Sequence, residues 1–316
     1  MEITPVSARP SSLLNCQCIG SEHKQIDYCE GPFGTVLNVF DRAINIKTAG
    51  DKLLVISLGQ VASPLTMNVM ASANSATSFS SVTDLVQKGD HVVVARKRRT
   101  ENGEIADILL GSKCAVIMNK HVQFFENHIL KPDLESLRKF FDYREYLLSV
   151  LRESAADRAG SLLNPDITTK GLLSDFMIQN HGMDIASPSF MNNLSRSLLA
   201  FCGRGPGFTP AGDDFIAGVL AVYNWVLRGL KLGAPLIPRL EYRKLTTWTS
   251  FKLMECNARG LVDVEAQDLI NSIASGDVLH YADSVRRIAK RGHTSGIDFA
   301  TGATIAVYLA IDGISR

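Results

Sequence analysis

The pattern of apolar and polar positions changes its period partway along the chain. In the first third, apolar residues form short runs with partial alternation, over residues 34–50, 51–59, 91–111 and 112–119. Turn residues separate these runs, and Glu101-Asn102-Gly103 is a typical hairpin turn. Several short strands with turns between them predict a small antiparallel β barrel or sandwich at the N-terminal end.

From about Pro132 onward, apolar residues recur every three or four positions, which is the spacing of an amphipathic helix. The segment 134–155 shows this first. The same helical character is found in residues 218–233, 245–260, 266–276, 281–292 and 301–313. With 316 residues, the chain is long enough for two cores. The sequence therefore predicts an α+β protein with a β-rich domain over residues 1–125 and a mostly α-helical domain over residues 126–316.

Two glycine-containing segments in the helical half repeat one another. GDDFIAG, residues 212–218, and GIDFATG, residues 296–302, have Gly, Asp, Phe and Gly at the same offsets. A Gly-x-Thr precedes each copy, and an apolar helix with a tyrosine follows it. A glycine kept inside a helix usually lets another backbone approach closely. We therefore expect two helices that pack through Gly218 and Gly302, with their N-terminal ends near each other.

The residues before these helices are suited to a binding site for an anion. Thr209 is a natural N-cap, and Pro210 fits the first helical position. Unpaired N–H groups at a helix start bind anions, and glycines before it would keep those groups accessible. The segment is neither a Walker motif nor a dinucleotide fingerprint. The alternative is a pair of tight loops that close a helical bundle.

Composition and charge limit the remaining possibilities. The net charge is +1, and the basic run at residues 96–99 has no interleaved aromatic residues, so we expect no binding of nucleic acid. The absence of a signal-peptide pattern and of 18 consecutive apolar residues leads us to expect no membrane association. Six dispersed cysteines are typical of free thiols in the cytoplasm. No clustered ligands suggest a metal site, and no cofactor is expected.

The run GRGPGFTPAGDDFIAG, followed about 85 residues later by GHTSGIDFATG, resembles the signature of the AllH family. The resemblance extends to Asn257-Ala-Arg259-Gly260 and, more loosely, to Ser63-Pro64-Leu65 in the β-rich half. It implies a carbamoyltransferase subunit of allantoin degradation, a part of purine catabolism. The complex would contain two other subunits and convert oxalurate and phosphate into oxamate and carbamoyl phosphate. Its substrates and products are small anions, and the chain is expected to be active only in the complex.

Three residues are candidates for catalysis. His293 is one because its reference pKa is near 6.5, and Asp213 and Asp214 are the others because a carboxylate can act as a base. Their structural alternatives are a loop histidine and two helix-capping aspartates. The candidate substrate-binding residues lie in or beside the two loops, or in the Asn-Ala-Arg-Gly segment: Gly203, Arg204, Gly205, Gly207, Thr209, Gly212, Arg259, Thr294, Ser295, Gly296 and Asp298.

Two further interpretations stay open on the residues alone. In one, the chain is a non-catalytic structural or regulatory subunit whose loop binds an anion or a nucleotide. In the other, it is a free-standing hydrolase that uses Asp213 and Asp214. The chain lacks the Ser-Thr-Arg-Thr loop of aspartate and ornithine transcarbamoylases, so their mechanism is not expected here.

Overall fold

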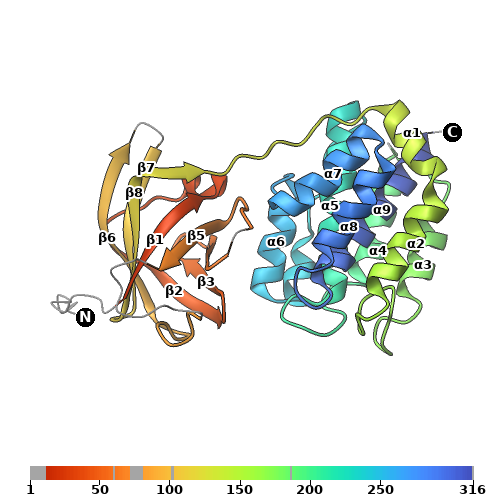
Figure 1. Ribbon diagram of the computed structural model, residues 1–316. Coiled ribbons are helices and arrows are strands. Elements are labelled where there is room, and N and C mark those ends of the chain that lie inside the picture. The colour runs from red at the N-terminus through yellow and green to blue at the C-terminus, as the bar shows by residue number, and fades with distance from the viewer. Residues whose placement is uncertain (1–11, 60, 72–80, 101–102, 186, 315–316) are drawn as a thin grey trace. The chain divides into compact units, whose positions relative to one another are not determined.

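The computed structural model describes residues 12–59, 61–71, 81–100, 103–185 and 187–314 (Figure 1). The chain divides into two compact units, residues 1–127 and 128–316. In the described residues, the strands belong to the first unit and the α-helices to the second.

The first unit is a closed β-barrel. Its elements are β1 (Ser12–Ile19), η1 (Ser21–Gln25), β2 (Gly31–Phe40), β3 (Ala43–Thr48), β4 (Leu53–Ser57), β5 (Thr66–Ala71), β6 (His91–Thr100), β7 (Gly103–Leu110) and β8 (Cys114–Phe124). Around the barrel the order is β1-β5-β4-β3-β2-β6-β7-β8. Alternate side chains of the strands, such as Leu14, Ile44 and Ile56, form its apolar core.

The expected antiparallel barrel is wrong in one respect, because the sheet is mixed. β1 pairs with β8 in parallel, and β4 pairs with β5 in parallel, whereas the other neighbours are antiparallel. A short turn predicts an antiparallel pair, but the parallel pairs join strands far apart in sequence or linked by a longer segment. The expected hairpin of β6 and β7 is present, and residues 101–102 of its turn lie outside the described residues.

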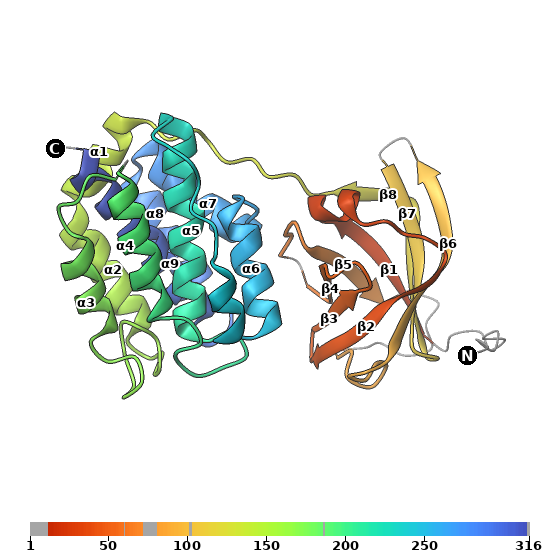
Figure 2. The same cartoon turned by 180° about the vertical axis from the view of Figure 1, so that it is seen from behind.

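The second unit is helical. Its elements are α1 (Leu134–Asp142), α2 (Arg144–Ala155), α3 (Leu172–Asn180), α4 (Pro188–Leu199), α5 (Ala211–Leu230), η2 (Leu240–Lys244), α6 (Trp248–Ala258), α7 (Val264–Ser275), α8 (Val278–Ile288) and α9 (Ser295–Ile314). The continuous helix expected over residues 134–155 is interrupted at Tyr143. Figures 1 and 2 show α5 and α9 in the middle of this unit, between α6 on one side and α2 and α3 on the other.

The two central helices approach each other through the glycines of the repeat, as the sequence predicts. A Cβ atom added to Gly218 would overlap the carbonyl oxygen of Phe299 and lie 2.9 Å from the Ala303 nitrogen. A Cβ atom added to Gly302 would overlap the carbonyl oxygen of Phe215 and lie 3.0 Å from the Val219 nitrogen. The contact is thus reciprocal, and each glycine packs on the backbone of the other helix.

The helix α9 is long and apolar enough to cross a membrane by length and composition alone. In the structure, 89% of its most apolar window is buried inside the protein. Such burial is what a central core helix requires.

We expect Gly218→Ala and Gly302→Ala each to destabilise the helical unit by about 1–3 kcal/mol, because the new methyl group overpacks the crossing. Since the two sites share one contact, the double variant should lose less than the sum of the single losses. Thermal melting followed by circular dichroism at 222 nm measures this. Gly50→Ala is the control, because its Cβ atom would meet nothing nearer than Thr48 Oγ1 at 3.9 Å. Melting points that match this control would contradict the proposed packing.

Candidate functional site

The starts of α5 and α9 are brought together by a direct contact between the two repeat copies. The hydroxyl groups of Thr209 and Ser295 share a hydrogen bond of 2.9 Å. The expectation that Thr209 caps α5 is wrong, because Pro210 occupies the N-cap position and no side chain caps that end. The threonine hydroxyl instead links the first loop to the first residue of α9. Thr294, directly before α9, is buried.

Most of the motif glycines are required by backbone packing. A side chain at Gly203, Gly212 or Gly296 would overlap a main-chain carbonyl, that of Leu245, Phe201 or Ile288 respectively. Gly205 and Gly207 have φ angles of 95° and 103°, which glycine adopts far more readily than other residues. Only at Gly207, of these five, would an added Cβ atom meet nothing closer than an ordinary contact, at 3.5 Å.

The expectation that the motif glycines expose their N–H groups to a ligand is wrong for Gly203, Gly212 and Gly296. The N–H of Gly203 donates to Asp213 Oδ1 at 2.7 Å. The N–H of Gly212 donates to the carbonyl oxygen of Arg204 at 2.9 Å, and that of Gly296 donates to Arg291 O at 3.2 Å. Three of the candidate donors are thus already used within the fold.

Asp213 holds the first loop in place. Its carboxyl group is buried and accepts hydrogen bonds from the Gly203 N–H and the Thr246 hydroxyl. Burial raises the pKa of Asp213, and these hydrogen bonds act in the opposite direction. Because both of its oxygen atoms are occupied, the structure favours an anchoring role for Asp213.

Asp214 and Asp298 occupy equivalent positions in the two repeat copies, and each has an oxygen without a partner. Asp298 is fully buried; its Oδ1 accepts from the Leu162 N–H at 2.8 Å, and its Oδ2 has no hydrogen-bond partner. Asp214 is partly accessible as a residue, but its Oδ2 is buried and also lacks a partner. Buried polar atoms of this kind are rare and call for an explanation.

Burial is the main cause of the raised pKa values of this pair. Burial raises the pKa of Asp214 to about 7, although the hydroxyls of Ser295 and Thr209 and the charge of Arg291 act to lower it. Burial raises the pKa of Asp298 well above its ordinary value, and the charge of Asp214 raises it further. Both shifts favour the protonated forms, as expected for carboxyl groups that are buried near each other.

His293 is exposed and is held by a segment far away in the sequence. Its Nε2–H donates to the carbonyl oxygen of Ala159 at 3.1 Å. The guanidinium of Arg158 donates to the carbonyl oxygens of Gly292 (3.2 Å) and His293 (3.0 Å). These contacts fix the second loop. The sequence does not predict the roles of Arg158, Leu162 and Thr246, because nothing in their local sequence marks them as neighbours of the motif.

Three arginines in or beside the motif segments differ in their surroundings. Arg204 is exposed, and within the described residues its guanidinium makes no hydrogen bond or ion pair. Arg291 forms an ion pair with Asp263 and lies over the ring of Phe299 at 5.4 Å. Arg259 follows α6, where its Nη2 lies 3.3 Å from Cys256 Sγ. Arg204 is therefore the best placed to bind an added anion beside α5.

No group of three or more His, Cys, Asp or Glu side chains that could hold a metal ion is found among the described residues. The paired helix starts thus offer two carboxyl groups, two hydroxyls and one exposed guanidinium. This set can orient a small polar molecule and exchange a proton with it.

Comparison with known proteins supports the resemblance seen in the sequence. The model of the AllH family, described as oxamate carbamoyltransferase subunit AllH, matches residues 201–307. The matched segment contains both repeat copies and the helices α5–α8, and it ends within α9. No curated protein and no solved structure matches the chain significantly.

The raised pKa of Asp214 predicts a pH-dependent stability. Because the folded pKa of about 7 lies above the ordinary 3.8, its contribution is complete below pH 3.8 and is lost as the pH rises through about 7. Asp214→Asn mimics the neutral carboxyl group, so the melting point of this variant relative to the wild type should rise between pH 5 and pH 8. Each kcal/mol corresponds to about 2–4 °C in a domain of this size.

The matched control for this measurement is Asp175→Asn, because Asp175 also lies in the first turn of a helix but is exposed. Its difference from the wild type should be the same at both pH values. A difference for Asp214→Asn that is equally flat would contradict the shifted pKa.

Proposed function

We propose that this chain is the AllH-type subunit of an oxamate carbamoyltransferase and that the paired starts of α5 and α9 bind its substrate. The observation that carries the proposal is the meeting of the two motif copies inside the family-matched segment, through Thr209 and Ser295. At the same place, the two motif aspartates each have an oxygen atom without a partner. The proposal places the chain in the cytoplasm, in purine catabolism through allantoin.

The reaction requires charge neutralisation, orientation and one proton transfer. Phosphate oxygen attacks the carbamoyl carbon of oxalurate, a C–O bond forms, the C–N bond breaks, and the oxamate nitrogen takes up a proton. Arg204 would hold a phosphate or the oxalurate carboxylate, since a guanidinium binds such groups through paired hydrogen bonds. A carboxyl group with a pKa near 7, such as Asp214, suits a proton donor at neutral pH.

The unpartnered carboxyl oxygens favour contact with the nitrogen end of the substrate. The ureido group of oxalurate carries N–H donors. When ionised, Asp214 Oδ2 and Asp298 Oδ2 are hydrogen-bond acceptors without a donor. A protonated member of the pair can instead donate to a carbonyl oxygen. The site would therefore bind the carbamoyl part near the aspartates and the anionic part near Arg204.

Two of the three proposed catalytic residues are better suited to positioning. Asp213 anchors the first loop, and His293 contacts the carbonyl oxygen of Ala159. This observation favours a shared active site, in which partner subunits supply further groups. It is also consistent with the second candidate function, in which this subunit binds the anion while another chain performs the chemistry.

Co-expression tests the subunit proposal. We expect the chain to co-elute in size exclusion with the two other subunits of the complex, and phosphorolysis of oxalurate to require all three. Carbamoyl phosphate formation by the isolated chain would contradict the obligate complex. Separate elution of the three chains would contradict the assembly.

Arg204→Gln tests the binding site within the assembled complex. We expect the KM for phosphate or oxalurate to rise about tenfold with little change in kcat, because the loss of one charged contact costs roughly 1.4 kcal/mol. The control is Arg196→Gln, an exposed arginine on α4. Equal kinetics for the two variants would place anion binding elsewhere.

A further inference from the structure

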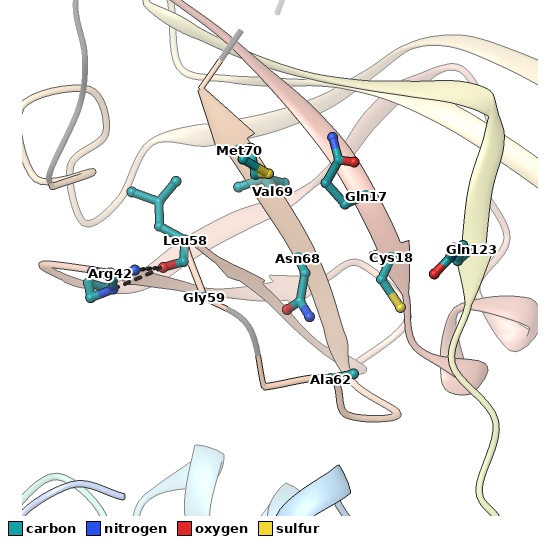
Figure 3. A pocket seen from close by; sticks show the side chains of 10 residues that line it. All are labelled: Gln17, Cys18, Arg42, Leu58, Gly59, Ala62, Asn68, Val69, Met70 and Gln123. Carbon is teal, nitrogen blue, oxygen red and sulfur yellow. Dashed lines mark hydrogen bonds between the residues drawn. The ribbon is translucent and has the colours of Figure 1, made fainter.

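A cavity of about 530 Å³ lies on the β-barrel, outside the segment that the family model matches. Its lining consists of Gln17, Cys18, Arg42, Leu58, Gly59, Ala62, Asn68, Val69, Met70 and Gln123 (Figure 3). The volume falls within the range of pockets that take small molecules. No residue of the proposed carbamoyl-transfer site lines it, so a ligand of this cavity would be independent of the proposed function.

Three polar side chains that line this cavity form a row across neighbouring strands. Asn68 of β5 is directly opposite Cys18 of β1, and Cys18 is directly opposite Gln123 of β8. Residues directly opposite each other point to the same face of a sheet. Figure 3 shows the side chains of Asn68 and Cys18 next to each other, with the amide oxygen of Gln123 directed toward Cys18.

This row lies on the outer face of the barrel. Met67 and Val69, the neighbours of Asn68 in β5, belong to the barrel core, and successive side chains of a strand point to opposite faces. The pairing of β1 is irregular between Cys16 and Cys18 toward both of its neighbours. Such an irregularity re-aims side chains and is frequent beside functional sites.

Asn68 is the clearest sign that something binds here. The residue is only 7% exposed, and its Oδ1 atom has no hydrogen-bond partner. A buried amide oxygen without a donor is destabilising. A ligand that enters the cavity and donates an N–H to this oxygen would remove that cost.

The other lining groups define the chemistry of the ligand. Burial raises the pKa of the Cys18 thiol, which therefore stays neutral at physiological pH. The guanidinium of Arg42 is fixed at one wall, where Nε and Nη2 donate to the carbonyl oxygen of Leu58 at 2.9 and 2.6 Å. Gln17 and Gln123 are exposed and offer both donors and acceptors, while Leu58, Ala62 and Met70 supply apolar surface.

We propose that this cavity binds a small uncharged molecule with an amide edge, an N–H beside a C=O, of the kind found in nucleobases and in ureides. The N–H donates to Asn68 Oδ1, and the adjacent C=O accepts from a side-chain amide N–H of the cavity lining. The apolar residues cover the flat faces of the ligand. The Cys18 thiol packs against it without reacting, because the neutral thiol is a poor nucleophile.

Binding is measured with the full chain by calorimetry and by the ligand-induced rise in melting point. The probes are uridine and hydantoin, one for each source of the amide edge, and 1,3-dimethyluracil, which has no N–H. We expect uridine or hydantoin to bind at least tenfold more tightly than 1,3-dimethyluracil, and the tighter of the two identifies the source. Equal binding of the methylated compound, or no binding of any probe at millimolar concentration, would overturn the proposal.

Asn68→Leu separates a binding role from a structural one. If the amide oxygen binds a ligand, this variant loses at least tenfold in affinity for the probe, while its melting point without ligand is maintained or raised. Asn45→Ala, a variant of a buried asparagine on β3 outside the cavity, is the matched control and should keep the wild-type affinity. A melting point that falls in Asn68→Leu with unchanged probe affinity would show that Asn68 serves only the fold.

Discussion

The approach of α5 and α9 through Gly218 and Gly302 is the constraint on which the helical unit depends. Each glycine lies against the backbone of the other helix, so neither position can hold a side chain unless the helices separate. The crossing lies only a few residues beyond each helix start. It therefore brings together the first turns, the loops before them and the charged groups that both carry.

This close approach has an electrostatic consequence. The repeat places an aspartate four residues before each crossing glycine, so tight packing brings Asp214 close enough to Asp298 for its charge to raise the pKa of Asp298. A negative charge suits the start of one helix, but two such charges share a buried space here. Burial favours their neutral forms, and hydrogen bonds such as that from the Leu162 N–H to Asp298 favour the charged form. One oxygen of each carboxyl group has no hydrogen-bond partner.

The sequence predicts the helices of the second unit except α3 and α4, and it predicts the crossing glycines, because periodicity and repetition are local signals. Strands β1 and β5 and the parallel pairs escape prediction, since no turn connects the partners directly. The distinct roles of Asp213 and Asp214 also escape it. Adjacent helical residues point about 100° apart, so one carboxyl group meets Gly203 and Thr246 while the other lies beside Ser295. The positions of segments distant in sequence decide which aspartate anchors the loop and which lies beside Ser295.

The repeat is symmetric in its helices but not in its loops. The first loop carries three glycines with positive φ angles and is anchored from within the motif by Asp213. At the equivalent position the second copy has buried Ile297.

The second loop is shorter and is held from outside by Arg158 instead. The charged groups are also distributed unequally. The exposed guanidinium of Arg204 lies on the first loop, and the fully buried carboxyl group of Asp298 lies on α9. A site of this kind distinguishes the two ends of a molecule. Oxalurate, the proposed substrate, has a carboxylate at one end and a carbamoyl group at the other, and so has the matching asymmetry.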